Sequence, residues 1–483
     1  MKRINNFING KYVESSSAAY FENINPATGE AISHVARSSK SDLEAALQAA
    51  KSAFSDWKKR SIEDRAKILY NIAEGIEAKL EDLAQAETAD TGKPIQFSRS
   101  IDIPRAAANF RFFAAAASQF ASESHDMAGK AINYTLRQPI GIVACISPWN
   151  LPLYLFTWKI APALASGNCV IAKPSELSPT TAYMLGQICN DAGLPPGVLN
   201  ILQGYGSGIG EAMIQHPDIK AISFTGGTKT GARIASLAAP QFKKLSLELG
   251  GKNPCIIFSD CDYDRTLKNV VRLAFSNSGQ ICLCGSRILI EQNIYDRFKA
   301  DLIKELESYI PADPLDPQTK MGSLISNEHL EKVDSFVKLA RAEGGKVLYG
   351  GERPRMQNQQ NRGAFYLPTV IEGLAPNSRC NMEEIFGPVI TLQSFQSEEE
   401  ALELANASAY GLASTLWTEN LSRAHRMSES LQTGIVWINC WLLRDLRTPF
   451  GGMNQSGVGR EGGWEVMRFF TEAKNVCINF AAR

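Results

Sequence analysis

The sequence predicts an α/β protein with more than one lobe, in which parallel sheets are covered by helices on both faces. Its 483 residues are too many for a single hydrophobic core of ordinary size. Since a domain typically holds roughly 100 to 200 residues, this length suggests two to four lobes. Between residues 142 and 249 short apolar runs alternate with amphipathic runs, as in right-handed βαβ units. The alternation resumes after residue 255, so a large multidomain enzyme is expected.

The part of the chain before residue 122 is expected to be mostly helical scaffold. Asn9-Gly10 is a strong hairpin signal, and apolar residues recur at helical spacing in three later stretches. The predicted elements are a hairpin over 7–13, a helix opened by a capping box at Ser41-Asp42-Leu43-Glu44, a helix from Ser61 to about Thr91, and an Ala-rich helix over 101–120.

The alternating block is expected to form one parallel sheet, joined by a hinge at 250–254 to a second α/β lobe. Such sheets bind ligands at the carboxyl ends of their strands. The expected strands of the block are 142–146, 168–172, 197–202, 221–225 and 245–249, with helices at 178–192, 208–216 and 230–238. Expected strands of the second lobe include 255–258, 346–349, 389–395 and 434–439.

Two strand-like stretches, 131–137 and 475–480, alternate polar and apolar residues but belong to neither lobe. We expect them to form a projecting flap that pairs with another subunit, in a homodimer or a homotetramer.

Composition excludes several kinds of partner. Lys plus Arg number 50 and so do Asp plus Glu, so no net positive field favours nucleic acid or an anionic membrane surface. Residues 1–6 lack the apolar core of a signal peptide, and no run approaches the roughly 18 apolar residues of a spanning helix. A cytoplasmic protein with neither nucleic acid nor membrane as a partner is expected.

The ten cysteines are scattered through apolar runs, which is the pattern of buried free thiols in a reducing compartment. The five histidines lie far apart, and Cys282-Leu283-Cys284 has no second cysteine pair nearby. No metal site is expected.

A candidate nucleophile lies in the stretch 277–287, where Gly279 and Gly285 flank Cys282 and Cys284. The glycines let other groups approach the backbone closely. A thiol of ordinary pKa, about 8.5, needs a helix N-terminus, a base or a cation to react as thiolate near neutral pH. A cysteine in such a loop is more often buried packing than a catalyst, so its partners must decide.

Two glycine-rich stretches are candidate phosphate cradles. The stretch 204–210 departs from the G-x-G-x-x-G register and is a weak signal. Residues 224–231 are better placed, because a buried strand ends in two glycines and a helix start follows whose N–H groups can hold a pyrophosphate. A plain βα turn is the alternative. Lys173 and Glu176 also follow a strand, where a carboxylate accepts ribose hydroxyls and repels a 2′-phosphate, which favours NAD over NADP.

Seven motifs, in order and at family-like spacing over essentially the whole chain, resemble those of the aldehyde dehydrogenase superfamily. They are Pro148-Trp149-Asn150, Lys173-Pro174-Ser175-Glu176, Phe224-Thr225-Gly226, Leu247-Glu248-Leu249-Gly250-Gly251-Lys252, the run 279–282, Glu384-Ile385-Phe386-Gly387-Pro388 and Pro449-Phe450-Gly451-Gly452. The resemblance implies a Rossmann-type NAD-binding domain at 1–121 and 139–250, an α/β catalytic domain at 251–448, and a small β oligomerisation flap at 122–138 and 466–483.

The resemblance also implies the catalytic roles. Cys282 matches the nucleophile, Glu248 the general base and Asn150 the oxyanion donor, while Lys159 matches a supporting lysine near the base. Attack of a Cys282 thiolate on an aldehyde makes an oxyanion that needs donors. After hydride loss, a thioester remains, and water activated by a carboxylate must hydrolyse it. Cys284 either protects Cys282 through a disulfide or fills space.

NAD is the cofactor that the resemblance implies. Lys173 and Glu176 match contacts to the adenosine ribose, and Glu384 and Phe386 match the nicotinamide end. Gly227 departs from the family, because many members carry a serine there, so its contact falls to backbone N–H groups or Thr228. The full expected set is Ile146, Trp149, Lys173, Ser175, Glu176, Gly206, Gly210, Phe224, Thr225, Gly226, Gly227, Thr228, Leu249, Glu384 and Phe386.

Within the superfamily, the stretches 101–111 and 439–447 resemble the 2-aminomuconate and 2-hydroxymuconate semialdehyde dehydrogenases of aromatic-ring catabolism. Arginine grips a carboxylate bidentately. Arg105 and Arg444, chosen over Arg111 and Arg447, are therefore expected to bind the far carboxylate of a small aldehyde substrate, with Asn150 at its carbonyl.

Three alternatives remain open at this point: a neutral or betaine-type aldehyde as substrate, a CoA-acylating relative, and a non-catalytic structural protein on the same fold. Glu248 argues against the second, since thiolysis needs no water-activating base. The intact set of Cys282, Glu248 and Asn150 argues against the third.

Overall fold

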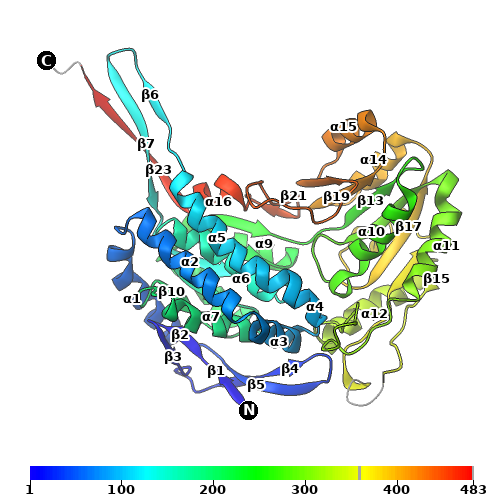
Figure 1. Ribbon diagram of the computed structural model, residues 1–483, viewed down its shortest axis with the longest axis horizontal. Helices are drawn as coiled ribbons and strands as arrows, with labels where there is room; N and C mark the ends of the chain where they lie inside the picture. The colour runs from blue at the N-terminus through cyan, green and yellow to red at the C-terminus, as the bar shows by residue number, and fades with distance from the viewer. Residues whose placement is uncertain (357–360, 481–483) are drawn as a thin grey trace.

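The computed structural model describes residues 1–356 and 361–480 and has two large sheets, each covered by helices (Figure 1). The first sheet has eight strands, of which the five central ones run parallel. Its strand order is β22 (Gly457–Val458), β12 (Lys244–Glu248), β11 (Ile219–Thr225), β8 (Ile142–Ile146), β9 (Cys169–Lys173), β10 (Leu199–Ile201), β2 (Asn6–Ile8) and β3 (Lys11–Val13).

The central strands are continuous apolar runs because both of their faces are buried. All five residues of β8 and of β9 are buried. Every residue of the helix α6 is buried as well, and α2 and α5 lie side by side with it over the sheet (Figure 1). Helices of this part are α1 (Lys40–Trp57), α2 (Ile62–Ala78), α3 (Leu80–Thr91), α4 (Ile95–Phe97), α5 (Ile103–Gln119), α6 (Pro152–Ala165), α7 (Thr180–Asp191), α8 (Glu211–Gln215) and α9 (Thr228–Ala238).

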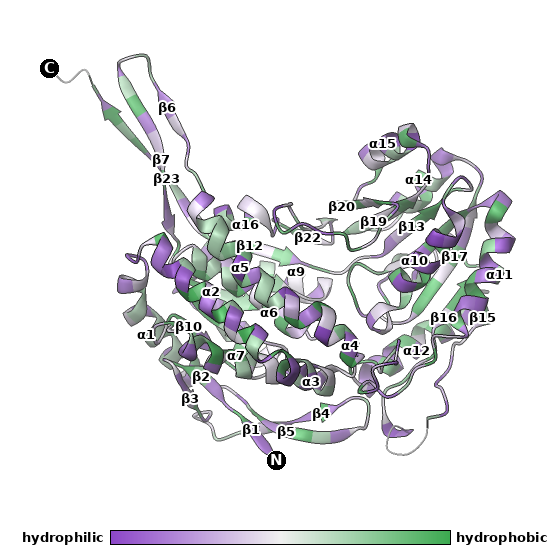
Figure 2. Cartoon of the chain, viewed as in Figure 1, coloured by the Kyte–Doolittle hydropathy of each residue, from purple (hydrophilic) through white to green (hydrophobic). Residues whose placement is uncertain are grey.

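The second sheet has seven strands, parallel except for β15 at one edge. Its order is β15 (Lys346–Tyr349), β16 (Thr369–Glu372), β17 (Val389–Phe395), β14 (Gly285–Glu291), β13 (Asn253–Ile257), β19 (Ala413–Trp417) and β20 (Ile435–Ile438). The helices that follow residue 260 are α10 (Tyr263–Phe275), α11 (Tyr295–Leu306), α12 (Asn327–Ala342), α13 (Arg379–Met382), α14 (Glu398–Asn406), α15 (Leu421–Ser430) and α16 (Gly463–Phe469). Figure 2 shows apolar colour on β13 and β17 and mixed colour on α11, the pattern of buried strands under amphipathic helices.

Three smaller sheets complete the fold. β23 (Thr471–Asn479) pairs antiparallel with β7 (Ala131–Pro139), which pairs with β6 (Ser124–Asp126), and this ribbon projects from the body (Figure 1). The two stretches 131–137 and 475–480 are therefore neighbours, while residues 481–483 of the expected flap lie outside the described part. The other two sheets are β1 (Lys2–Ile4), β5 (Glu30–Ala36) and β4 (Tyr20–Asn25), and the pair β18 (Tyr410–Gly411) and β21 (Met453–Asn454).

The predicted α/β class and the strand–helix alternation are confirmed, and two local predictions are wrong. The first helix is capped by Ser39, whose side chain accepts from the backbone of Asp42, and not by Ser41. The predicted long helix from Ser61 is two helices, because the backbone leaves the helical region at Lys79 (φ −110°, ψ 23°). Apolar spacing continues across this break, so the sequence pattern does not reveal it.

Three general features bear on partners and ligands. Within residues 1–356 and 361–480, none of the helices combines the length and apolarity needed to cross a bilayer. All ten cysteines are free thiols. No group of His, Cys, Asp or Glu side chains in the described part of the chain is arranged to hold a metal ion.

Candidate active site

Four strands of the first sheet end side by side and define the site. The register pairs Ile146 with Lys173, Phe224 with Ile146, and Thr225 with Glu248. These are last residues, or nearly so, of β8, β9, β11 and β12. The carboxyl ends of parallel strands thus carry most of the predicted motifs, which is where such sheets bind ligands.

The Cys282 loop crosses to this edge from the second sheet. Asn277 and Ser278 adopt left-handed backbone (φ 49° and 55°), and Gly279 (φ 71°) lies against the carbonyl of Gly387, with no room for a Cβ. The predicted close approach at Gly279 is confirmed. The Asn253 side chain donates to the carbonyl oxygens of Cys282 (2.7 Å) and Cys284 (2.9 Å).

Asn150 binds this loop from the first sheet. Its Nδ2 donates to the carbonyl oxygen of Gln280 (2.9 Å), and Asn277 Nδ2 donates to the Asn150 carbonyl (3.0 Å). Asn150 and Cys282 also line one cavity. The predicted pairing of these two residues in space is therefore present.

Glu248 is buried at the end of β12, and neither of its carboxylate oxygens has a hydrogen-bond partner within residues 1–356 and 361–480. Burial raises its pKa well above the ordinary value, and the Glu461 carboxylate raises it further, while Lys159, Arg444 and Arg460 oppose the shift. A Cβ on Gly451 would lie 2.7 Å from Glu248 Oε1. The glycine therefore leaves room beside this carboxylate, whose charged form is disfavoured by burial.

Lys159 does not bind Glu248 directly. Its Nζ lies 2.6 Å from Glu461 Oε1 and 3.3 Å from Ser223 Oγ, and both members of the ion pair are buried. The lysine is near the base, as expected, but it acts on Glu248 through its field and through Glu461.

The Cys282 thiol is partly exposed in this cavity. Burial raises its pKa, as do the carboxylates of Glu384 and Glu248, whereas Arg444 lowers it. Neighbouring Cys284 is fully buried, and burial raises its pKa to about 12. Arg444 is the smallest of these influences, so the raised pKa of Cys282 is set by burial and the two carboxylates.

Two cavities lie along the strand ends. The first, of about 260 Å³, contains Cys282 and Asn150, and the second is about 420 Å³. Of the residues expected to bind the cofactor, Trp149, Thr225, Gly226, Gly227, Leu249, Glu384 and Phe386 line the first, while Ile146, Glu176, Gly206, Gly210 and Phe224 line the second.

The remaining three expected cofactor residues lie beside these cavities. Lys173 Nζ is 3.3 Å from Glu176 Oε2. The Ser175 hydroxyl oxygen accepts a hydrogen bond from the backbone N–H of Leu177 (3.2 Å). Thr228 begins α9, whose first turn has no side-chain cap. Free N–H groups at a helix start suit a pyrophosphate, and the Glu176 carboxylate suits a ribose, so the residues fit NAD.

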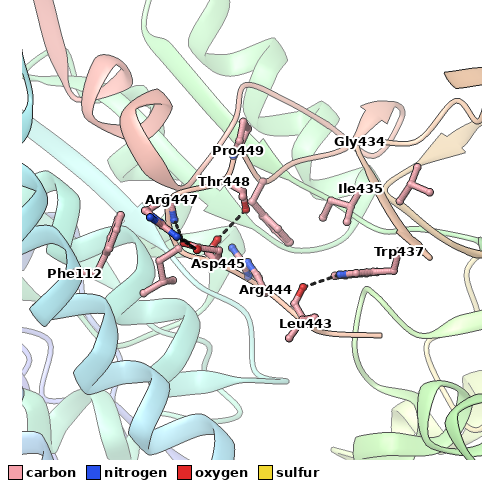
Figure 3. Close-up of a pocket in the computed structure, with 13 residues that line it drawn as sticks. Phe112, Gly434, Ile435, Trp437, Leu443, Arg444, Asp445, Arg447, Thr448 and Pro449 are labelled. Carbon is pink, nitrogen blue, oxygen red and sulfur yellow. Dashed lines mark hydrogen bonds and ion pairs between the residues drawn. The ribbon is translucent and has the colours of Figure 1, made fainter. Parts of the chain in front are cut away.

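A third cavity, of about 840 Å³, lies between α5 and the loop that precedes Phe450 (Figure 3). Arg444 lines it, with its guanidinium 3.7 Å from the ring centre of Phe450 and 4.7 Å from that of Trp158. Its Nη1 donates to the Tyr154 hydroxyl (2.7 Å), while Nε and Nη2 are buried without a partner among the described residues. Arg105 lies over the same tyrosine ring at 5.6 Å.

Arg111 and Arg447 are engaged elsewhere. Arg111 forms an ion pair with Glu77 and Arg447 forms one with Asp445, and all four side chains are exposed. Figure 3 shows the Asp445–Arg447 pair at the rim of the cavity. The structure therefore brings together the two arginines that the sequence favoured.

Several residues of the site were missed at the sequence level. Tyr154 joins the two arginines, and Trp441 donates from Nε1 to the carbonyl of Leu283 (3.0 Å) beside the nucleophile. His329 and Lys332 line the Cys282 cavity, and burial lowers the pKa of His329 to about 4. These contacts join distant parts of the chain, so no local pattern indicates them.

This fold and this constellation of a cavity cysteine, a buried carboxylate and an amide define an aldehyde-oxidising enzyme class. The profile of the aldehyde dehydrogenase family matches residues 12–476. The chain belongs to the aldehyde dehydrogenase family and is an NAD-dependent oxidoreductase. The expected family, fold and cofactor are confirmed.

Similar proteins include curated relatives and solved structures. The chain is 48% identical to a human 2-aminomuconic semialdehyde dehydrogenase over 478 residues, covering 98% of each chain. It is 48% identical over 484 residues to a 2-hydroxymuconic semialdehyde dehydrogenase of a Pseudomonas species, covering 99% of this chain and 100% of the relative. A betaine aldehyde dehydrogenase of Staphylococcus aureus, crystallised with NAD⁺, superposes with a TM-score of 0.96 at 37% identity, covering 99% of this chain and 95% of that one.

Proposed function

We propose that the protein oxidises a muconic semialdehyde, 2-aminomuconate or 2-hydroxymuconate semialdehyde, to the dicarboxylate with NAD. The observation that carries this proposal is the convergence of Arg105 and Arg444 on Tyr154, with Arg444 also lining the large cavity. Two arginine N–H groups without partners among the described residues suit the far carboxylate of such a substrate. Two relatives that are 48% identical to this chain are named for these substrates.

The first half-reaction belongs to Cys282 and Asn150. The thiolate attacks the aldehyde carbon, and the new C–S bond leaves the carbonyl oxygen as an oxyanion. The Asn150 side-chain amide has a second N–H beside the one that Gln280 accepts, and it donates this N–H to that oxygen together with the Cys282 backbone N–H. NAD, when bound, supplies the hydride acceptor, and the two-electron oxidation leaves a thioester on Cys282.

The second half-reaction belongs to Glu248. Its carboxylate takes a proton from water, which attacks the thioester carbon and releases the acid and the Cys282 thiolate. A buried base with a raised pKa suits this task. Hydrolysis therefore fits better than transfer to CoA, which needs no such base.

We assign NAD contacts to the expected set. Glu176 and Lys173 hold the adenosine ribose, the start of α9 with Gly227 and Thr228 holds the pyrophosphate, and Glu384 with Phe386 holds the nicotinamide ribose. The two cavities along the strand ends support these assignments.

We also propose a division of the chain into domains, an oligomeric state and a cellular location. Residues 1–121 and 139–250 form the NAD-binding domain, 251–448 the catalytic domain, and 122–138 with 466–483 the oligomerisation flap of a cytoplasmic homodimer or homotetramer. The two large sheets and the projecting β6–β7–β23 ribbon support this division.

The test is steady-state oxidation of a panel of aldehydes, with and without CoA. A muconic semialdehyde is expected to show the highest kcat/KM, with a free dicarboxylate as product. Faster turnover of neutral or betaine-type aldehydes would overturn the substrate assignment, and formation of an acyl-CoA would overturn the hydrolytic one.

A further inference from the structure

A buried charge cluster lies directly behind Asn150 and has no part in the reaction described above. Its centre is Lys93, which follows the end of α3 and whose side chain is wholly buried. Lys93 Nζ donates to Glu87 Oε1 (3.2 Å), to Asp102 Oδ2 and to the carbonyl oxygen of Asn150 (2.9 Å). The two carboxylates are also wholly buried.

Burying these charges costs free energy, because the loss of hydration is offset only by close pairing and further hydrogen bonds. Burial raises the pKa of Asp102, and Lys93 opposes that shift. A hydrophobic core would be an easier solution for stability alone. The bond from Lys93 to Asn150 is the contact that links this cluster to the reaction.

Hydrogen bonds hold both the main-chain carbonyl and the side-chain amide of Asn150. Its carbonyl accepts from Lys93 Nζ and from Asn277 Nδ2 (3.0 Å), while its own amide donates to Gln280. Glu87 Oε2 accepts from the backbone N–H of Leu153 (3.1 Å), which anchors the segment that follows. The backbone position of Asn150 is therefore set by Lys93 of the cluster together with Asn277 of the Cys282 loop.

The cluster also meets the helix that carries Arg105. Asp102 is the last residue of a short π-helical segment (Ser98–Asp102), and α5 begins at the next residue. Such π segments are frequent at functional sites. One lysine thus ties the oxyanion residue to the base of the arginine helix.

We propose that Lys93 is a positioning residue for the oxyanion donor: through the Asn150 main-chain carbonyl, it holds the Asn150 amide at the distance from Cys282 that the tetrahedral oxyanion requires. The inference rests on the proposed role of Asn150. Lys93 touches neither substrate nor cofactor and acts only through Asn150.

The first experiment compares Lys93→Met with Lys243→Met in the full-length protein. Lys243 is also a buried lysine that donates to backbone carbonyls, those of Ile214 and His216, so it controls for loss of a buried cation. The readout is the rate of the first burst of NADH at saturating NAD, together with NAD affinity. Lys93→Met is expected to slow the burst about 10- to 100-fold, less than the 100- to 1,000-fold typical of losing an oxyanion donor, with NAD affinity unchanged. Lys243→Met is expected to leave the burst rate within about twofold, since the carbonyls that Lys243 binds belong neither to Asn150 nor to the Cys282 loop.

A double-mutant cycle identifies the route of the effect. If Lys93 acts through Asn150, Lys93→Met adds nothing to the slow burst of Asn150→Ala, because the amide to be positioned is already gone. Multiplicative losses in the double variant would overturn the proposal. A normal burst in Asn150→Ala would instead overturn the proposed role of Asn150 itself, so the two failures are distinguishable.

A charge-compensated variant covers the case in which Lys93→Met folds poorly. Lys93→Met/Glu87→Gln removes one cation and one anion, and the glutamine keeps an oxygen for the Leu153 N–H. Thermal stability is expected to recover while the burst stays slow. Recovery of the burst rate along with stability would show that Lys93 only neutralises its carboxylates, and the proposal would fail.

Discussion

Arg444 donates a 2.7 Å hydrogen bond to the hydroxyl of Tyr154, and the ring of that tyrosine lies 5.6 Å from the guanidinium of Arg105. The two arginines lie about 340 residues apart in the sequence, Arg105 on α5 and Arg444 in the loop before Phe450, yet both contact the same tyrosine. Neither forms a salt bridge with a described carboxylate, in contrast to Arg111 and Arg447. Arg444 therefore presents a positive charge, with no salt-bridge partner among the described residues, at the large cavity that it lines.

Replacing either arginine is expected to weaken binding of a carboxylated substrate. Arg105→Met and Arg444→Met should each lower kcat/KM for a muconic semialdehyde about 10- to 100-fold, since a charge-assisted hydrogen bond contributes roughly 1.5–3 kcal/mol. KM should carry most of the loss, and a neutral aliphatic aldehyde should be affected much less.

Matched controls lie on the same elements. Arg111→Met, on the helix of Arg105, and Arg447→Met, in the loop of Arg444, remove cations that already have exposed carboxylate partners. Both should change kcat/KM by less than about threefold, because exposed pairs contribute little. Equal losses for charged and neutral aldehydes in the Arg105 and Arg444 variants would show that these arginines are structural.

Cys282→Ala is expected to abolish NADH formation while NAD still binds, because only the covalent step is lost. Cys284→Ala is the control, since Cys284 is buried and does not line the cavity that contains Cys282. Isothermal titration with NAD and a rate assay with aldehyde check both. Residual turnover in Cys282→Ala that disappears in the double variant would assign the nucleophile to Cys284 instead.

Glu248→Gln is expected to trap the thioester, because hydride loss needs no base but hydrolysis does. The isosteric amide also removes a buried charge that has no hydrogen-bond partner among the described residues. Steady turnover should fall about 100-fold or more, as is typical for loss of a general base. Rapid mixing should still show a burst of NADH, and intact mass should show one acyl group on Cys282; normal turnover would contradict the role.

The pH dependence of hydrolysis should respond to Glu461. The Glu461 carboxylate raises the pKa of Glu248 because two like charges resist ionisation together. In Glu461→Gln this repulsion is lost, so Glu248 should ionise at lower pH and the acid limb of the kcat profile should move to lower pH. The control Glu465→Gln alters an exposed carboxylate paired with Arg468 and should leave the limb in place. An unmoved limb in Glu461→Gln would indicate that another group accepts the proton.

The sequence predicted the sheet and its strand ends well, for a physical reason. Parallel strands buried on both faces are continuous apolar runs, and the polar residues that follow them, such as Lys173, meet at one edge whatever their separation in the chain. Glu248 belongs to the same edge because β12 pairs in register with β11. Periodicity failed at Lys79, where the chain turns although the apolar spacing continues.

The contacts that shape the site were less accessible to sequence reasoning. Tyr154, Lys93 and Trp441 act through hydrogen bonds to residues far away in the chain. Such pairings depend on how two lobes pack, and a buried lysine has the same local signature as an exposed one. Family resemblance selected Arg444 over Arg447, and in the structure Arg447 forms an exposed ion pair with Asp445.

Cofactor choice offers the last prediction, and it rests on Glu176. Its carboxylate lies 3.3 Å from Lys173 Nζ and lines the cavity that we propose for the adenosine, so in the proposed complex it would face the ribose hydroxyls. A 2′-phosphate there would meet a like charge, and even about 1.4 kcal/mol of repulsion corresponds to tenfold in affinity. The protein should therefore prefer NAD over NADP, and Glu176→Gln should narrow the ratio of the two kcat/KM values by at least about tenfold. Glu211→Gln is the matched control, since Glu211 lines the same cavity and is likewise paired with a cation, Arg233 at 3.0 Å, but is not assigned to the ribose. If both variants narrow the ratio alike, the general negative field of the cavity sets the preference and Glu176 has no special place at the ribose.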